Sequence, residues 1–551
     1  MYVNYERYTR FVLLPSTLIS LLVFLLLITL LRPVIVELGL FSVVLYSIPL
    51  LIELIALMYP KLVVGRVRKE IEDNIHFYIT HMGALATSEV SRKEMMKMLS
   101  ERKEYKALAE ETRKIYLLMD KWNKNLAQAC RFLAKRTPSK ILSDFLDRMA
   151  HELDSGEDFK EFIKREQENV MDAFANLYQG RLYSVDVFKE VYISLILSLS
   201  FFAAFAIIAP FLAGISVKLV LNIILIFFII IEVGIVFYLR TMVPVDPIWQ
   251  TSGEFTEMDW KLYKAFYIAC ALCLIAFTFV LFVSYVWKIL TIPPPFIIAL
   301  SITPLLYPGI LSKKAEAIIR NKDKNAPSFI MSLGASASAR GGNIVDSLKY
   351  LTAHDFGALT KDIRDLYKRL STRLNKKRAW EKFSINTGSN LIYRFIDMFV
   401  EALTLGSDPK DVAEIVSKNF NRINSLRERR DRTANTFVGI CYGAIIGIAV
   451  ALYISFGVVE IMNKMFTSLN VPGGFVQGIL HTVSGLELAY INVVILFILF
   501  FHAIMSAIAI KMIDGGRWMS GFVHLVGMIW TAAIAGYVSQ IAIHYLMGGM
   551  I

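Results

Sequence analysis

The sequence predicts an all-α, polytopic membrane protein with about nine transmembrane helices and two duplicated cytoplasmic helical-bundle domains. Of its 551 residues, 56% are hydrophobic and only 19% are charged, which is too apolar for a soluble protein of this length. Several apolar runs reach twenty or more residues, long enough to cross a bilayer as helices. The two polar segments between these runs show helical periodicity and lack the alternation typical of strands.

The apolar runs set the expected order of spans and domains. The expected spans cover 11–31, 34–59, 191–214, 219–239, 265–287, 292–311, 437–461, 488–510 and 521–543. They divide the chain into two spans (1–60), a polar domain (61–190), four spans (191–311), a second polar domain (312–436) and three spans (437–551). Because the sixth span carries five prolines, we expect it to be kinked or broken.

The formal net charge of +12 lies almost entirely in the second polar segment. Residues 312–435 carry 24 Lys and Arg against 14 Asp and Glu, whereas residues 60–190 carry 24 against 22. Such an excess can attract either an acidic partner protein or anionic lipid headgroups. The Lys and Arg residues flanking the spans favour a cytoplasmic N-terminus, two cytoplasmic polar domains and an external C-terminus.

A helical hairpin is expected at 324–351. Small residues recur at helical spacing in 327–339, the sequence Arg340-Gly-Gly-Asn breaks the helix, and 344–351 starts a second amphipathic run. Small residues let two helices approach closely, and the two glycines permit a tight reversal. The polar segments also match each other at an offset near 250, for example Gly83 with Gly334. This repetition predicts an internal duplication of a helical bundle.

A basic helix face is the most informative polar feature. Within 355–374 the apolar residues recur every three or four positions, and Lys361, Arg364 and Lys368, three and four positions apart, share one face. The wider candidate docking set adds Arg340, Lys349, Arg369, Arg373, Lys376, Lys377 and Arg378. Docking of an acidic partner and a solvated face near lipid headgroups both explain this charge.

A second basic cluster lies directly before the seventh span. It is expected to contact membrane lipid headgroups, and its residues are Arg427, Arg429, Arg430 and Arg432. Nucleic acid is a poor partner for either cluster because no aromatic stacking platform accompanies the charge.

The sequence lacks the motifs of an enzyme. It has no GxxxxGK[ST] loop, no HExxH and no GxSxG, so neither catalysis nor a metal or cofactor is expected. The four cysteines, including the Cys270-x-x-Cys273 pair inside a span, are expected to be packing residues.

Ionisable residues inside the expected spans have two interpretations. Glu53, Glu232 and His502 either form a proton or ion relay or make packing hydrogen bonds. We expect packing, because a relay needs several such groups in line. The sequence from Asp514 to Arg517 predicts a turn with a local ion pair.

The small-residue helix, the Gly-Gly break and the sequence IVDSLKYL in 327–351, with LTLGSD at 403–408, resemble the type II secretion F-domain family. These are polytopic platform proteins of type IV pilus-like machines. The additional spans, with one pair before the first domain, resemble the archaeal branch, most of all the archaellum (archaeal flagellum) platforms. The archaeal adhesion-pilus platforms are the close alternative.

The resemblance implies a non-enzymatic protein of the cytoplasmic membrane. Its cytoplasmic domains would bind a hexameric secretion-type ATPase and couple it to insertion of filament subunits, either archaellin or pilin, and in the archaellum to rotation. The near-neutral first domain would form a homodimer. A secondary transporter is the alternative from a different class. However, transporter repeats duplicate the membrane spans, whereas the repeat here lies in the polar segments.

Overall fold

The computed structural model describes residues 4–29, 42–213, 215–287, 292–372, 375–468 and 483–548. Within these residues every regular element is a helix, with one isolated β-bridge between Trp249 and Ser389. Eight helices of the described residues are long and apolar enough to cross a membrane, and they contain most of the expected first span and most of each of the third to ninth. The second expected span begins outside the described residues and continues in α4 (Ser42–Ala86). The all-α membrane fold is therefore confirmed, and the second expected span stays a prediction.

The chain forms two compact units. Unit 1 comprises Met1–Phe174 and Leu405–Ser407, and unit 2 comprises Ala175–Thr404 and Asp408–Ile551. The described helices of unit 1 are α1 (Tyr5–Tyr8), η1 (Thr9–Leu13), α2 (Leu14–Thr29), α4, α5 (Arg92–Glu101), η3 (Lys103–Tyr105), α6 (Ala107–Lys121), α7 (Leu126–Ala134), α8 (Lys140–Asp154) and the start of α9 (Phe159–Ala213).

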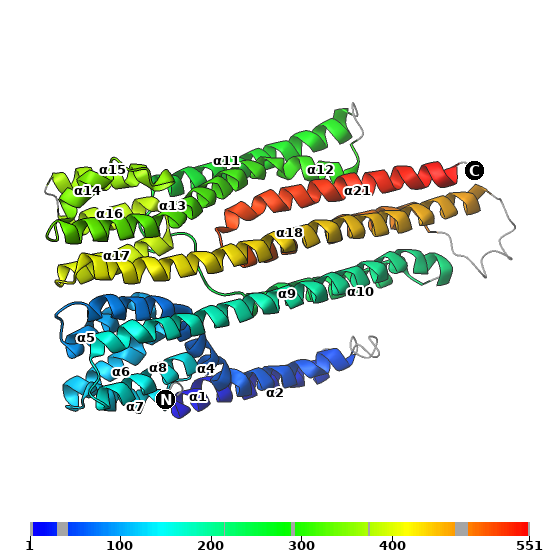
Figure 1. Cartoon of the computed structure of the whole chain (residues 1–551). Coiled ribbons are helices and arrows are strands. Elements are labelled where there is room, and N and C mark those ends of the chain that lie inside the picture. Colours follow the sequence, from blue (N-terminus) through cyan, green and yellow to red (C-terminus); the bar gives the residue numbers. More distant parts are fainter. Residues whose placement is uncertain are drawn as a thin grey trace. The chain divides into compact units, whose positions relative to one another are not determined.

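Unit 2 contains the rest of α9 and the remaining helices. Its first half holds α10 (Val217–Met242), α11 (Glu257–Leu281), η4 (Phe282–Trp287), α12 (Pro294–Ile302), η5 (Thr303–Leu305), α13 (Leu306–Ala339), α14 (Ile344–Leu351), η6 (Gly357–Leu359) and α15 (Thr360–Ser371). Its second half holds α16 (Lys376–Thr387), α17 (Asn390–Thr404), α18 (Pro409–Ser468), α20 (Gly485–Asp514), η7 (Trp518–Gly521) and α21 (Phe522–Gly548). Helices α14–α17 gather at one end of α18, and α21 lies toward its other end (Figure 1).

Long helices run through the expected domain boundaries. The boundaries at 190/191, 311/312 and 436/437 fall inside α9, α13 and α18 respectively. In the expected sixth span, α12 passes into the 3-10 turn η5 at Thr303–Leu305 and then into α13, which is the interruption that its prolines predict. Each polar segment is thus joined to membrane spans through continuous helix.

The two polar segments contain the same order of elements. Each has a long helix, a short helix, a 3-10 turn, three further helices and a second long helix, from α4 to α9 and from α13 to α18. This shared order supports the predicted duplication, which stays a prediction.

The predicted hairpin at 324–351 is present. Helix α13 ends at Ala339, and Gly341 and Gly342 follow with φ values of 63° and 84°, which favour glycine. Asn343 then caps α14 by accepting hydrogen bonds from the backbone N–H groups of Val345 and Asp346.

The close approach between helices at Gly334 joins α13 to α18. A Cβ atom added to Gly334 would lie 2.2 Å from the Cβ of Ala413 and 2.4 Å from the carbonyl oxygen of Pro409, both on α18. At Gly334, therefore, the small side chain admits α18 rather than the second helix of the hairpin. In unit 1, Gly83 of α4 similarly faces Gln167 of α9.

We expect Gly334→Ala to destabilise unit 2, because the α18 backbone must move to admit the new methyl group. Overpacking of this kind costs about 1–3 kcal/mol. Gly443→Ala is the matched control, since nothing lies within 4 Å of the Cβ position there. Chemical unfolding of the purified protein measures both, and equal free energies of unfolding for the two variants would contradict the packing argument.

Candidate functional site

The predicted basic helix is α15, shorter at both ends than the periodicity suggested. Ile363, Leu366 and Leu370 are buried, which confirms the predicted apolar face. The residues on the outer face that are exposed are Lys361, Arg364 and Lys368, and we call these three the basic face. Two of them also have contacts within the segment: Arg364 reaches the carbonyl oxygen of Thr352 at 3.4 Å, and Lys368 lies 3.8 Å from Asp365.

An ion pair fixes α15 against the long helix behind it. Asp362, on the inner side of α15, lies 2.8 Å from the Nζ atom of Lys322 on α13. Burial raises the pKa of Asp362, while the positive charge of Lys322 acts in the opposite direction. The basic face is therefore presented on a helix held by both apolar packing and an ion pair.

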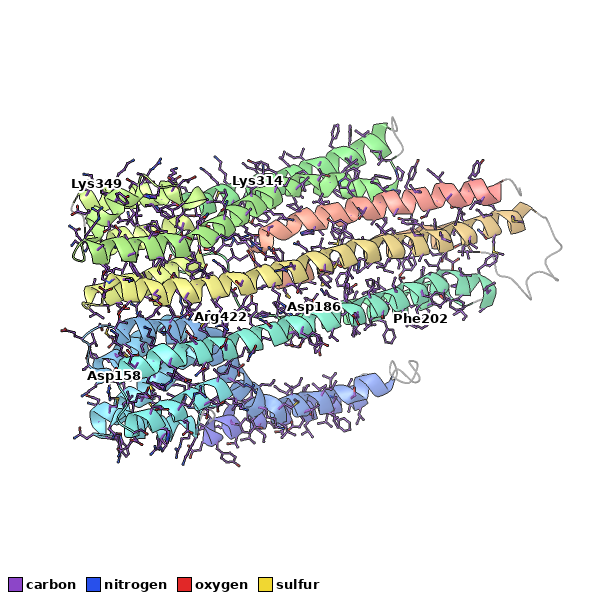
Figure 2. The ribbon with its side chains drawn as sticks, in the orientation of Figure 1. Asp158, Asp186, Phe202, Lys314, Lys349 and Arg422 are labelled. Carbon is purple, nitrogen blue, oxygen red and sulfur yellow. The ribbon has the colours of Figure 1, made fainter. Side chains whose placement is uncertain are left out.

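The rest of the candidate docking set lies around this helix. Lys349 is exposed on α14 in the group of helices at the end of α13 (Figure 2), and the Arg340 guanidinium lies 5.2 Å from the ring of Tyr350. Lys376 and Lys377 are exposed, and Arg369 is half-buried.

Two members of the docking set differ from the others. Arg378 is exposed but pairs with Glu381 at 2.7 Å and with Glu254 at 3.1 Å, so part of its charge is neutralised locally. Arg373 lies outside the described residues.

The expected headgroup role is wrong for Arg427. Its side chain is 11% exposed and pairs with Asp246 at 2.5 Å and Asp323 at 3.0 Å. It also donates a hydrogen bond to the carbonyl oxygen of Pro247 at 2.9 Å. Bidentate pairing of this kind is what the planar guanidinium group favours, and it leaves Arg427 turned into the protein.

Arg430 is also held inside the protein. It is 4% exposed and donates hydrogen bonds to the carbonyl oxygens of Ile513 at 2.6 Å, Met512 at 3.1 Å and Asp246 at 3.2 Å. The first two carbonyls belong to the last turn of α20, where a cation is favoured by the unpaired carbonyl groups and the helix dipole. Arg429 and Arg432 remain exposed, so the headgroup prediction now concerns these two residues only.

Glu316 of α13 is the centre of a second cluster. It is 3% exposed, and its carboxylate lies 3.3 Å from Lys511 Nζ on α20. It accepts hydrogen bonds from the backbone N–H of Arg517 at 2.6 Å, the indole Nε1 of Trp249 at 3.3 Å and the hydroxyl of Ser520 at 3.1 Å. One buried carboxylate thus connects α13, α20, η7 and the connector before α11.

The predicted local ion pair between Asp514 and Arg517 is wrong. Asp514 instead lies 2.7 Å from Lys511 and 2.6 Å from Arg320. Arg517 forms an ion pair with Asp259, and its guanidinium lies 3.9 Å from the centre of the Trp249 ring. The turn itself is present, with Gly515 at φ 81°.

These contacts form one polar junction in unit 2. Its members are Asp246, Asp259, Glu316, Arg320, Asp323, Arg427, Arg430, Asp431, Lys511, Asp514 and Arg517. Six carboxylates face five cations, so the junction is nearly neutral. It links α13 and α18 to α20, η7, α11 and the 243–256 connector, and it was missed from the sequence. The available signal was the number of charges at the ends of apolar runs, but the ion pair between Asp259 and Arg517 joins residues 258 positions apart.

The three ionisable residues inside the expected spans differ from one another in their hydrogen-bond partners. The Oε2 atom of Glu53 is buried and makes no hydrogen bond in the described part of the chain. Glu232 and His502, in contrast, contact each other across α10 and α20 at 2.5 Å. No group of three or more His, Cys, Asp or Glu side chains suited to a metal ion occurs among the described residues.

Comparison with known proteins decides the family. Two proteins called flagella accessory protein J match almost the full chain. The protein from Methanocaldococcus jannaschii is 38% identical over 93% of this chain and 91% of its own length, and that from Methanococcus voltae is 37% identical over 92% of each. The chain belongs to the flagella accessory protein J family.

The membership confirms the resemblance to the archaellum platforms. A family profile described as "Type II secretion system (T2SS), protein F" matches residues 78–207. This match covers most of the first polar segment and the third span, whereas the motifs that suggested the family from the sequence lie in the second segment. No solved structure matches the chain.

Proposed function

We propose that this protein is the membrane platform of an archaellum and that it docks a hexameric secretion-type ATPase through the basic face of α15. The family membership supports the flagellar role. The docking proposal rests on one observation: Lys361, Arg364 and Lys368 lie exposed on a single fixed helix face, opposite a buried apolar side. A cationic surface of this kind suits an acidic partner surface, which it attracts over a long range.

The long helices supply a way to transmit movement. Helices α13 and α18 carry the second polar segment at one end and apolar, span-forming sequence at the other. The polar junction ties the middle of both helices to α20 and η7. A push on α15 would therefore reach the spans through continuous helix, and the platform would use it to insert archaellin subunits and to support rotation.

The membrane arrangement forms part of the same proposal. The polar segments 61–190 and 312–436 act as cytoplasmic domains, the N-terminus is cytoplasmic and the C-terminus is outside. The nearly neutral first domain serves dimerisation. The names of the two relatives, flagella accessory protein J, favour the archaellum over an adhesion pilus.

Charge reversal at Lys361, Arg364 and Lys368 tests the docking proposal. We expect the triple variant to Glu to weaken ATPase binding by at least about tenfold, because three attractive charges become repulsive. The measurement is the equilibrium binding of the secretion-type ATPase to the full-length protein in nanodiscs at two salt concentrations. The wild-type affinity is expected to fall at the higher salt.

A matched triple variant controls for net charge. Lys103, Lys124 and Lys140 are exposed in the first polar segment, and their change to Glu alters the formal charge by the same amount. We expect this control to bind the ATPase normally. Equal affinities for both triple variants, with unchanged thermal unfolding, would place the docking site elsewhere. Failure of wild-type protein to bind the ATPase, together with solute flux in liposomes, would favour the transporter instead.

A further inference from the structure

A buried hydrogen-bonded chain crosses the core of the membrane-spanning helices in unit 2. The Oε1 atom of Glu232 (α10) lies 2.5 Å from Nδ1 of His502 (α20), and Nε2 of His502 lies 3.4 Å from the hydroxyl of Ser506. Ser506 is 3.0 Å from the hydroxyl of Tyr192 (α9), which lies 3.9 Å from the Sγ atom of Cys441 (α18). Four helices therefore contribute to one polar chain.

This hydrogen-bonded network of side chains is enclosed by apolar residues. Its five side chains are each at most 1% exposed, and the ring of Phe228 lies 6.4 Å from that of His502. His502 is twelve residues from Asp514, the last residue of α20, which is about 18 Å along a helix. Ionisable residues this deep in a membrane are costly and usually functional.

We propose that Glu232 and His502 form a proton-binding site inside the membrane, and that Ser506, Tyr192 and Cys441 allow the pair to hold either two protons or one. With two protons, Nδ1–H donates to the Glu232 carboxylate and Nε2–H donates to Ser506. Ser506 then donates to Tyr192, and Tyr192 donates to the sulfur of Cys441. The pair is an imidazolium with a carboxylate and has no net charge.

Release of the Nε2 proton to water, which reaches the site when the surrounding helices open transiently, reverses the outer part of the hydrogen-bonded network. Cys441 then donates to Tyr192, Tyr192 donates to Ser506, and Ser506 donates to the lone pair on Nε2. Only the N–H bond at Nε2 is broken, and the hydroxyl and thiol hydrogens rotate. Each polar group keeps a partner in both forms, so neither form leaves an unsatisfied group in the core.

The proton occupancy sets the charge between α10 and α20. Loss of the proton leaves one net negative charge in an apolar core, which is unfavourable. The singly protonated form thus holds α10 less firmly against α20.

Other titratable groups lie around the pair. Tyr192 and Cys441 face it from α9 and α18, and Lys511 lies nine residues further along α20 in the polar junction. From α21, His524 contacts Tyr442 of α18. The proposal is independent of ATPase docking, because it concerns different residues and needs no partner.

Nitrogen-15 NMR of the full-length protein in nanodiscs tests this site, with His502→Gln used to assign the signals. Across the pH range in which the protein stays folded, we expect Nε2 of His502 to change between protonated and unprotonated forms while Nδ1 stays protonated. Glu232→Gln should abolish this step, because a buried imidazolium then lacks its carboxylate. A single protonation state in wild type throughout that range would overturn the proposal.

Two serine variants distinguish the effect of the hydrogen bond to His502 from the effect of losing a buried hydroxyl group. Ser506→Ala removes the partner of Nε2, and we expect it to shift the midpoint of the His502 titration. Ser455→Ala is the matched control, because Ser455 donates to the carbonyl oxygen of Ala451 within α18. We expect this control to titrate like wild type. Unchanged titration in both Ser506→Ala and Glu232→Gln would overturn the assignment.

Discussion

Arg427→Met is expected to lower the free energy of unfolding by about 3–5 kcal/mol, since it leaves buried carboxylates without their cation. Asp246 and Asp323 both pair with Arg427, and the side chain of Asp323 is 4% exposed. Methionine retains much of the apolar packing of the aliphatic part of Arg427, so the loss of unfolding free energy reflects mainly the missing charge. Denaturant titration of the purified protein measures the effect.

Two further variants identify the cause of that loss. In Arg427→Met combined with Asp246→Asn and Asp323→Asn, no unpaired carboxylate remains at these positions, and we expect much of the stability to return. Arg429→Met removes an exposed arginine, two residues further along the same helix, whose described partner is Gln179 at 3.0 Å. This control should unfold like wild type. A triple variant no more stable than Arg427→Met alone would show that the charges do not explain the loss.

Glu316→Leu is expected to have an effect of similar size, about 3–5 kcal/mol, and also to stop filament assembly. The change leaves the ammonium group of Lys511 with Asp514 alone, and it removes the acceptor of the Arg517 backbone N–H. The contact between α13 and α20 would loosen at the point where we propose that movement passes to the spans. Denaturant titration and a motility assay in a host lacking the native gene measure the two effects.

A graded series makes the Glu316 prediction specific. Glu316→Gln keeps a carbonyl oxygen for the Arg517 N–H but loses the charge that Lys511 needs, so we expect an intermediate loss. Glu428→Leu removes a glutamate from an exposed pair with Lys324 at 3.1 Å, and such pairs contribute little. If Glu428→Leu proved as damaging as Glu316→Leu, burial of the polar junction would not be the source of its importance.

The two predictions concern Arg427 and Glu316, and only the first of these lies in a sequence pattern that suggests a role. Arg427 stands in a basic run before a span, and such a run beside a membrane is usually solvated and favours lipid headgroups. Glu316 belongs to no local motif. Both depend on partners more than 70 positions away in the sequence, such as Asp323 and Asp246 for Arg427 and Lys511 for Glu316. Local patterns carry no information about such pairing.

Local sequence patterns were sufficient to predict the all-α membrane class, the positions of most spans, the two polar segments, the hairpin at 324–351 and the family. Each of these follows from a local property: the length of an apolar run, a helical period, a Gly-Gly break or a set of motifs. The tertiary structure alone decided that Gly334 packs on α18, that Arg427 and Arg430 face inward, and that Glu232 meets His502. These facts depend on which helices become neighbours, and that choice results from the packing of the whole chain.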